Sequence, residues 1–139
     1  MPRLTHILLA KALLEVLLVA GLATGFYLSA FPPYFRGTLD TADAAGVSGW
    51  ALNEAAPAER VEVQLYIDGR FVAHTVADQP RPDVLAAGRA ADELCGFVFA
   101  GPFTLDAGPH EARVYALHAS NGGARQTLQI IGQPLTFTR

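Results

Sequence analysis

The run of residues 16–31, VLLVAGLATGFYLSAF, constrains this chain more than any other stretch, because sixteen consecutive residues carry no charge. Widening the window to residues 12–34 adds one charge, that of Glu15. A helix rises about 1.5 Å per residue, so about 20 such residues cross a hydrocarbon core of about 30 Å. Pro32 and Pro33 follow, and prolines end a helix because they lack the N–H donor. The sequence therefore predicts a single transmembrane helix.

A cleaved secretory signal peptide is the main alternative, because it also combines a basic start with an apolar core. The apolar run is longer than the roughly 7–15 residues of a signal core. Cleavage after Ala30 would place Leu28 where a small residue is preferred, and the better pair, Ala23 and Gly25, falls inside the run. We therefore expect an uncleaved anchor.

Charges on either side of the run predict its orientation. Arg3, Lys11 and the terminal amine precede it, whereas Arg36 is the basic residue that soon follows. Basic residues favour the cytoplasmic side of a span. We expect a bacterial inner-membrane protein with its N-terminus in the cytoplasm and its C-terminal domain in the periplasm or outside the cell.

Lys11 and Glu15 are the charges closest to the apolar run, and two interpretations of them stay open. Four residues apart, they lie on one helix face and can pair. At the cytoplasmic headgroups both side chains would snorkel to water. If the helix instead starts near Leu4, Glu15 lies within the hydrocarbon and should face protein rather than lipid.

The helix also carries small residues and, at its outer end, aromatic rings. Gly21-x-x-x-Gly25 is a pattern of closely packed membrane helices. Aromatic rings prefer the headgroup region and would fix the depth of the helix. The expected helix-packing residues are Gly21, Gly25, Ser29, Lys11 and Glu15, and the expected aromatic belt is Phe26, Tyr27, Phe31, Tyr34 and Phe35.

After the anchor, the pattern changes to that of a β domain. Residues 60–67 alternate apolar and polar side chains, as in a half-buried strand, and residues 70–76 return after Asp68-Gly69, a typical hairpin turn. Residues 79–94 break this rhythm, and residues 83–88 suggest one or two helical turns. Further strands are expected at 37–40, 47–52, 96–99, 111–119, 125–131 and 135–137, with 34–46 mainly a linker. We divide the chain into residues 1–35, the cytoplasmic N-terminus and membrane helix, and residues 36–139, an antiparallel β-sandwich.

Several short motifs of this region resemble small Ig-like modules of bacterial surface proteins and glycosyltransferases. They are Gly49-Trp50-Ala51, Asp68-Gly69, Arg81-Pro82-Asp83-Val84, Gly96-Phe97 and Gly108-Pro109-His110. The resemblance implies an all-β, antiparallel Ig-like β-sandwich behind the single transmembrane helix, and a module without catalysis.

Candidate catalytic and binding residues are few. From residue 37 onward the chain has seven Arg, no Lys and twelve acidic residues, a net charge of −5 that offers nothing to nucleic acid. Cys95 sits among apolar neighbours, so we expect a buried thiol without redox or nucleophilic function. Trp50 is expected in the sandwich core, with a sugar-stacking platform as the alternative.

Metal and catalytic motifs are also missing. His110 and His118 lack ligand spacing, and we interpret His110 as a strand-entry residue and His118 as a buried or edge residue. Acids around the 79–94 segment lack the spacing of a calcium loop, and the serines of the β domain are not in a nucleophile motif. These residues are Asp78, Asp83, Asp92, Glu93, Ser48 and Ser120. We expect no catalytic residue, no metal and no cofactor.

These observations lead to a hypothesis for function. We expect a non-catalytic single-pass accessory subunit that stabilises a larger membrane complex, for instance an energy-transducing (respiratory or photosynthetic) one, through its helix and its outer β-sandwich. Its partners would be the lipid bilayer and other integral membrane subunits. The alternative is a membrane-tethered module that binds carbohydrate or envelope components. An apolar patch on the sandwich would favour the first, and an exposed Trp50 or a groove lined by aromatic rings the second.

Overall fold

The structure is a computed structural model that describes residues 2–30 and 34–139. The chain divides into two units, Met1–Pro33 and Tyr34–Arg139. We call the second unit the β domain. Phe31, expected in the aromatic belt, and the helix-ending residues Pro32 and Pro33 lie outside the described residues.

The first unit contains one long helix, α1 (Pro2–Ala30). Residues Arg3–Leu28 within it are long and apolar enough to cross a membrane, although a signal sequence near an N-terminus has the same property. Apolar side chains surround the helix on all sides and are exposed. The helix begins at Pro2, before Leu4, and the depth of Glu15 in a membrane stays a prediction.

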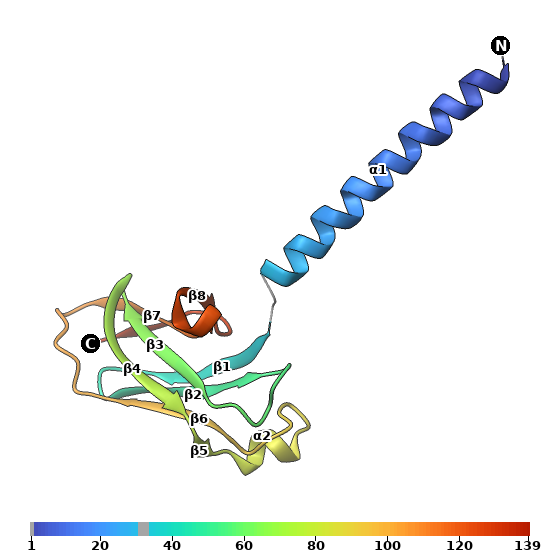
Figure 1. The fold of residues 1–139 in the computed structure, drawn as a ribbon. Coiled ribbons are helices and arrows are strands. Elements are labelled where there is room, and N and C mark those ends of the chain that lie inside the picture. Colours follow the sequence, from blue (N-terminus) through green and yellow to red (C-terminus); the bar gives the residue numbers. More distant parts are fainter. Residues whose placement is uncertain (1, 31–33) are drawn as a thin grey trace. The chain divides into compact units, whose positions relative to one another are not determined.

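The β domain consists of two antiparallel sheets (Figure 1). Sheet A has the strand order β1-β2-β6-β5, and sheet B the order β4-β3-β7-β8, with β9 also pairing with β7. The strands of sheet A are β1 (Phe35–Ala42), β2 (Gly46–Asn53), β5 (Gln79–Pro80) and β6 (Leu94–Ala100). Those of sheet B are β3 (Val61–Ile67), β4 (Arg70–Ala77), β7 (Pro109–Ser120), β8 (Arg125–Ile130) and β9 (Leu135–Thr138). Two short helical elements complete the unit, α2 (Pro82–Ala86) and the 3-10 turn η1 (Asn121–Gly123).

The two sheets pack face to face over one apolar core, an arrangement consistent with a β-sandwich. Alternate residues of each strand enter this core, because successive side chains of a strand point to opposite faces. Sheet A contributes Val47, Ala51, Phe97 and Phe99, and sheet B contributes Val63, Leu65, Val114 and Ala116. Phe97 and Phe99 of β6 and the even-numbered apolar residues of β7 thus point into the core.

The hairpin between β3 and β4 forms as the sequence predicts. Ile67 pairs with Arg70, so Asp68 and Gly69 are the two turn residues. Both have positive φ, 52° and 76°, as a primed two-residue turn requires. The turn sets the pairs Ile67–Arg70 and Tyr66–Phe71, and a bulge at Val72 shifts the register by one residue beyond them.

The start of the β domain differs from the sequence prediction. The linker expected over 34–46 is mostly strand, because β1 spans Phe35–Ala42. The ring centroids of Tyr34 and Phe35 each lie 6.0 Å from that of His118 on β7, and Phe35 also packs against the core. These two rings, predicted to belong to the membrane belt, are therefore part of the β domain. Phe26 and Tyr27 remain exposed on α1.

Candidate interaction surface

The segment 79–94 covers the part of the outer face of sheet A around Trp50, whereas Val98 on the same face is 46% exposed. Trp50 and Leu52 point to this outer side, opposite Val47 and Ala51, which enter the core. They form a second buried cluster with Val84, Ala90 and Cys95. Trp50 is buried, as predicted, at 4% exposure, but its predicted place in the main core is wrong. Sequence periodicity alone cannot distinguish a residue facing the other sheet from one covered by a loop.

An arginine holds this covering segment to sheet A. The Nε and Nη2 atoms of Arg81 donate to the two carboxylate oxygens of Asp83, both at 2.8 Å. Its Nη1 donates to Asp40 Oδ2 at 2.6 Å. Asp40 lies at a bulge of β1, between the paired residues Leu39 and Thr41. We call Arg81, Asp40 and Asp83 the Arg81 cluster.

The cluster explains the motif Arg81-Pro82-Asp83-Val84. Pro82 starts α2, Val84 enters the Trp50 cluster, and the two charged residues form a forked ion pair. Hydrogen bonds from Arg81 hold the pKa of Asp83 at about 2, and the same bonds raise the pKa of Arg81. The Arg81 side chain lies over Gly96, and a Cβ at this position would lie only 2.8 Å from Arg81 Cγ, so a glycine is required there. The motif therefore has a structural function.

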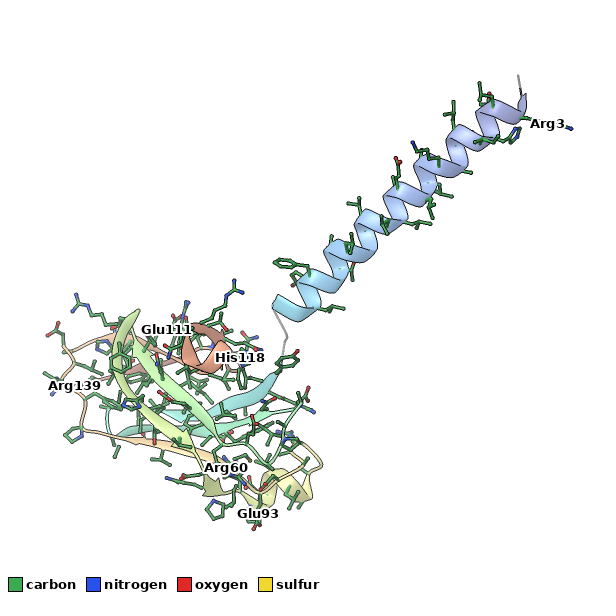
Figure 2. The ribbon with its side chains drawn as sticks, in the orientation of Figure 1. Arg3, Arg60, Glu93, Glu111, His118 and Arg139 are labelled. Carbon is green, nitrogen blue, oxygen red and sulfur yellow. The ribbon has the colours of Figure 1, made fainter. Side chains whose placement is uncertain are left out.

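A second arginine fixes the other end of the segment. Arg60 Nη2 donates to Asp92 Oδ2 at 3.0 Å, and its Nη1 donates to the carbonyl of Leu94. Figure 2 shows Arg60 beside the end of the segment that carries Glu93. The acids of this region, which lack calcium-loop spacing, are thus engaged separately, Asp83 by Arg81 and Asp92 by Arg60. Within residues 2–30 and 34–139, no three His, Cys, Asp or Glu side chains converge on a metal site.

His110 lies at the entry to β7, as the sequence predicts, and its ring is held between two hydrogen-bond acceptors. Its Nδ1 lies 2.6 Å from Asp68 Oδ2 and its Nε2 lies 2.8 Å from the carbonyl oxygen of Asp106. Since both partners accept, the doubly protonated ring satisfies both bonds, and the pKa of His110 is raised, chiefly by Asp68. The bond to His110 and the N–H of Glu111 lower the pKa of Asp68.

These bonds limit what His110 can do chemically. Both ring nitrogens are occupied, so neither is free to take a proton from a substrate. The ring borders a groove of about 460 Å³ that is also lined by Arg70, Phe71 and Thr104. The candidate nucleophiles considered from the sequence lie elsewhere: Cys95 is buried in the Trp50 cluster, where burial raises the pKa of its thiol, and Ser48 shares a hydrogen bond of 2.7 Å with Thr41.

The outer face of sheet B differs from all of these sites, because large apolar side chains lie uncovered on it. The residues of β3 and β7 that do not enter the core, among them Tyr66, Tyr115 and Leu117, point to this side. Phe71 on β4 is 54% exposed, and Leu128 on β8 is 45% exposed. We call this surface the open face, and it comprises Tyr66, Phe71, Val76, Tyr115, Leu117, Leu128 and Ile130.

Strand register brings the residues of the open face together. The Tyr66 ring makes edge-on contacts with Phe71, at 5.7 Å between centroids, and with Tyr115, at 5.2 Å. Tyr115 pairs with Ile130, and Leu117 pairs with Leu128. The result is a diagonal band of apolar side chains across four strands. Exposed bands of this kind, rich in Tyr and Phe, are typical of protein-binding surfaces.

Charged groups in opposite-sign pairs lie among and beside the apolar residues of the open face, and Arg113 is the direct cross-strand neighbour of Tyr66. Arg113 Nε lies 2.6 Å from Glu111 Oε1, and His74 Nδ1 lies 3.5 Å from Glu62 Oε1. Figure 2 labels Glu111 and His118 on β7. The accessory-subunit hypothesis expected an apolar patch on the sandwich, but the residues of the open face were not predicted, because the register between strands far apart in the chain cannot be read from the sequence.

On α1, the expected pairing is present, with Lys11 Nζ 3.6 Å from Glu15 Oε1. Outside the adjacent turns of the helix, no atom of residues 2–30 and 34–139 lies within 4 Å of a Cβ built at Gly21 or Gly25. The side chain of Ser29 is outside what the structure describes. The function of these residues in helix packing stays a prediction.

A scan against protein-family models, a search of the curated proteins and a search of the solved structures each return no match.

Proposed function

We propose that this protein is a non-catalytic accessory subunit of a membrane complex, anchored by α1, whose β domain binds another protein subunit through the open face. The observation that carries this proposal is the apolar band in which exposed Phe71, Leu128 and Ile130 flank the half-buried rings of Tyr66 and Tyr115. Such exposure lowers the solubility of a β domain, and a protein partner removes the band from water. The Ig-like character of the domain belongs to the same proposal, because Ig-like modules commonly act as binding modules.

The alternative, a module that binds carbohydrate, has less support. Its clearest expected feature was an exposed Trp50, and this side chain is buried under the segment 79–94. Apart from His110 itself, Phe71 is the one aromatic side chain among the described residues that lines the groove beside His110. A sugar platform normally offers a broad flat ring, and the open face offers rings that meet edge to edge instead.

The test compares two outer faces of the same β domain. The full-length protein carries the double substitution Phe71→Ser and Leu128→Ser, and the matched control is Val98→Ser, at a residue of β6 that is 46% exposed on the other sheet. Each variant is purified from native membranes in gentle detergent, and its co-purifying subunits are identified. We expect the double variant to lose them at least tenfold, and the control to keep them.

Two outcomes would contradict the proposal. If both variants retain the same co-purifying subunits, the open face is not the binding surface. If the protein binds envelope glycans and the double variant loses that binding, the carbohydrate module replaces the accessory subunit.

The proposed location is the bacterial inner membrane, with the β domain on the outer side. Arg3 and Lys11 precede the central part of α1 and favour a cytoplasmic N-terminus. Protease added to spheroplasts should therefore digest the β domain. Protection until the membrane is broken would reverse the orientation, and recovery of a chain lacking α1 would identify a signal peptide.

A further inference from the structure

The charges of α1 belong to a regular stripe along the helix. Alternating steps of four and three residues connect Lys11, Glu15, Leu18, Leu22, Gly25 and Ser29. Residues at this spacing stay on one side of a helix and form the contact line of left-handed helix pairs. We call these six residues the heptad seam. It includes four of the five residues expected from the sequence to act in helix packing, and Gly21 flanks it.

The position of the seam matters only if α1 spans a membrane, so an inference drawn from it rests on the proposed function. Phe26 and Tyr27 are aromatic residues suited to the outer headgroup boundary. Glu15 precedes Phe26 by eleven residues, which is about 16 Å along a helix. With a hydrocarbon core of about 30 Å, Glu15 lies near its middle, and Lys11 lies about 6 Å closer to the cytoplasmic side.

An ion pair at this depth needs polar surroundings. Lys11 Nζ and Glu15 Oε1 are 3.6 Å apart, and both side chains are mostly exposed on the helix surface, 72% and 64%. Lipid tails supply no hydrogen bonds, so the two groups keep unsatisfied donors and acceptors when the helix is alone. Their own charges suggest which partner would satisfy them.

A second copy of the same helix has the required charges in the required places. Lys11 and Glu15 lie about 40° apart around the helix, on either side of the middle of the seam. A two-fold axis along the membrane normal sets the Lys11 side of one helix opposite the Glu15 side of the other, and the reverse contact follows by symmetry. Four charges of alternating sign then surround the axis, and each ammonium meets two carboxylates.

The rest of the seam suits close approach of two helices. Leu18 and Leu22 supply the packing surface, and Gly25 lets the backbones come close near the outer end. Outside the adjacent turns of α1, no atom of the described residues lies within 4 Å of a Cβ built at Gly25, so an effect of substitution there would report on a neighbouring molecule.

We propose that α1 forms a parallel, two-fold symmetric dimer through the heptad seam, closed by a ring of Lys11 and Glu15 from both copies. The accessory subunit would thus enter its complex as a pair. A pair presents two open faces, so it can join two partner subunits.

The test uses charge reversal in two differently tagged full-length copies that are made in the same membrane. Recovery of one tag with the other measures association, and resistance to carbonate extraction first establishes insertion. Lys11→Glu alone gives four acidic groups and Glu15→Lys alone gives four basic groups, so each should reduce recovery of its own kind at least tenfold. Co-production of these two single variants should restore association, and the doubly reversed variant K11E/E15K should retain it.

A size-matched pair of substitutions tests the seam independently of charge. Gly25→Leu places bulk on the seam, whereas Ala20→Leu places it about 140° away around the helix. We expect the first to reduce recovery several-fold and the second to leave it unchanged.

The outcomes separate the dimer from the proposed function. The dimer is wrong if insertion is normal but the wild-type copies do not associate. It is also wrong if co-production of Lys11→Glu and Glu15→Lys does not restore association. In either case the anchored accessory subunit stands. If carbonate extracts the protein, the membrane anchor itself is wrong. If all variants of α1 associate equally well, the two copies pair through the β domain instead of the heptad seam.

Discussion

The two outer faces of the β domain contrast, since the segment 79–94 covers the large apolar residues Trp50 and Leu52 of sheet A whereas the apolar band on sheet B is bare. Under the cover, Trp50 and Val84 are buried, and the Arg81 cluster fixes the segment to β1. On the bare side, Phe71 and Leu128 remain about half exposed. Apolar residues on an outward strand face therefore do not reveal their purpose by themselves. One set stabilises the fold, and we assign the other set to binding.

The greatest loss of stability is expected on the covered face. Trp50→Ala should lower the free energy of unfolding by about 3–5 kcal/mol, because it leaves a large cavity beneath the segment 79–94. Denaturant unfolding of the full-length protein in detergent, followed by far-UV circular dichroism, measures this. Trp50→Phe should recover part of the loss. An unchanged midpoint for Trp50→Ala would mean that the covered face does not stabilise the domain.

A smaller loss is expected when the cover is loosened without a cavity. Arg81→Met keeps the apolar stem over Gly96 but removes three charged hydrogen bonds, at a site where the Arg81 side chain is 24% exposed. We expect the free energy of unfolding to fall by about 1–2 kcal/mol, a value discounted for the exposure of the ion pairs to solvent. The same measurement applies, and Asp40→Asn, which weakens one bond, should cost less than Arg81→Met.

The Arg81 cluster also has a pH signature. Because the pKa of Asp83 is lowered from 3.8 to about 2, its contribution to stability is present above 3.8 and is lost as the pH falls towards 2. Arg81→Met should remove this acid sensitivity. Acid unfolding curves that keep the same shape in this variant would contradict it.

The His110 contact at the edge of the open face should give a modest pH dependence of stability of its own. The pKa of His110 is raised above 6.5, so its contribution is complete below 6.5 and is lost as the pH rises through the raised value. The pKa of Asp68 is lowered, so its contribution is present above 3.8 and is lost in stronger acid. The contact is therefore strongest between these values, and His110→Gln should flatten the decline in melting temperature on the alkaline side.

The least change in stability is expected on the open face. Leu128→Ser removes a side chain that is 45% exposed, so the free energy of unfolding should change by no more than about 0.5 kcal/mol. Chemical denaturation measures it alongside Trp50→Ala. A loss as large as that of the covered face would show that the open face is structural, and the contrast between the two faces would disappear.

Local patterns along the chain suffice to predict most elements of this protein. The uncharged run of residues 16–31 has the length and apolar character of a membrane-spanning helix, and the Lys11–Glu15 pair results from a spacing of four. Alternation over residues 60–67 and the Asp68-Gly69 turn give the β3–β4 hairpin, since both depend on neighbours in the chain. The strand expected at 37–40 within the linker 34–46 is present but longer, because β1 (Phe35–Ala42) is short of apolar alternation and is held mainly by pairing with β2.

Which surfaces are covered depends on tertiary packing. Arg81 meets Asp40, and His110 meets Asp68, across more than forty residues of chain. The open face likewise depends on the register of β3, β4, β7 and β8. A period of two indicates which residues share one side of a strand, but it contains no information about the element that packs on that side. Trp50 and Tyr66 both point outward from their sheets. The segment 79–94 packs on sheet A and not on sheet B, so Trp50 stabilises the fold, whereas Tyr66 remains available to a partner.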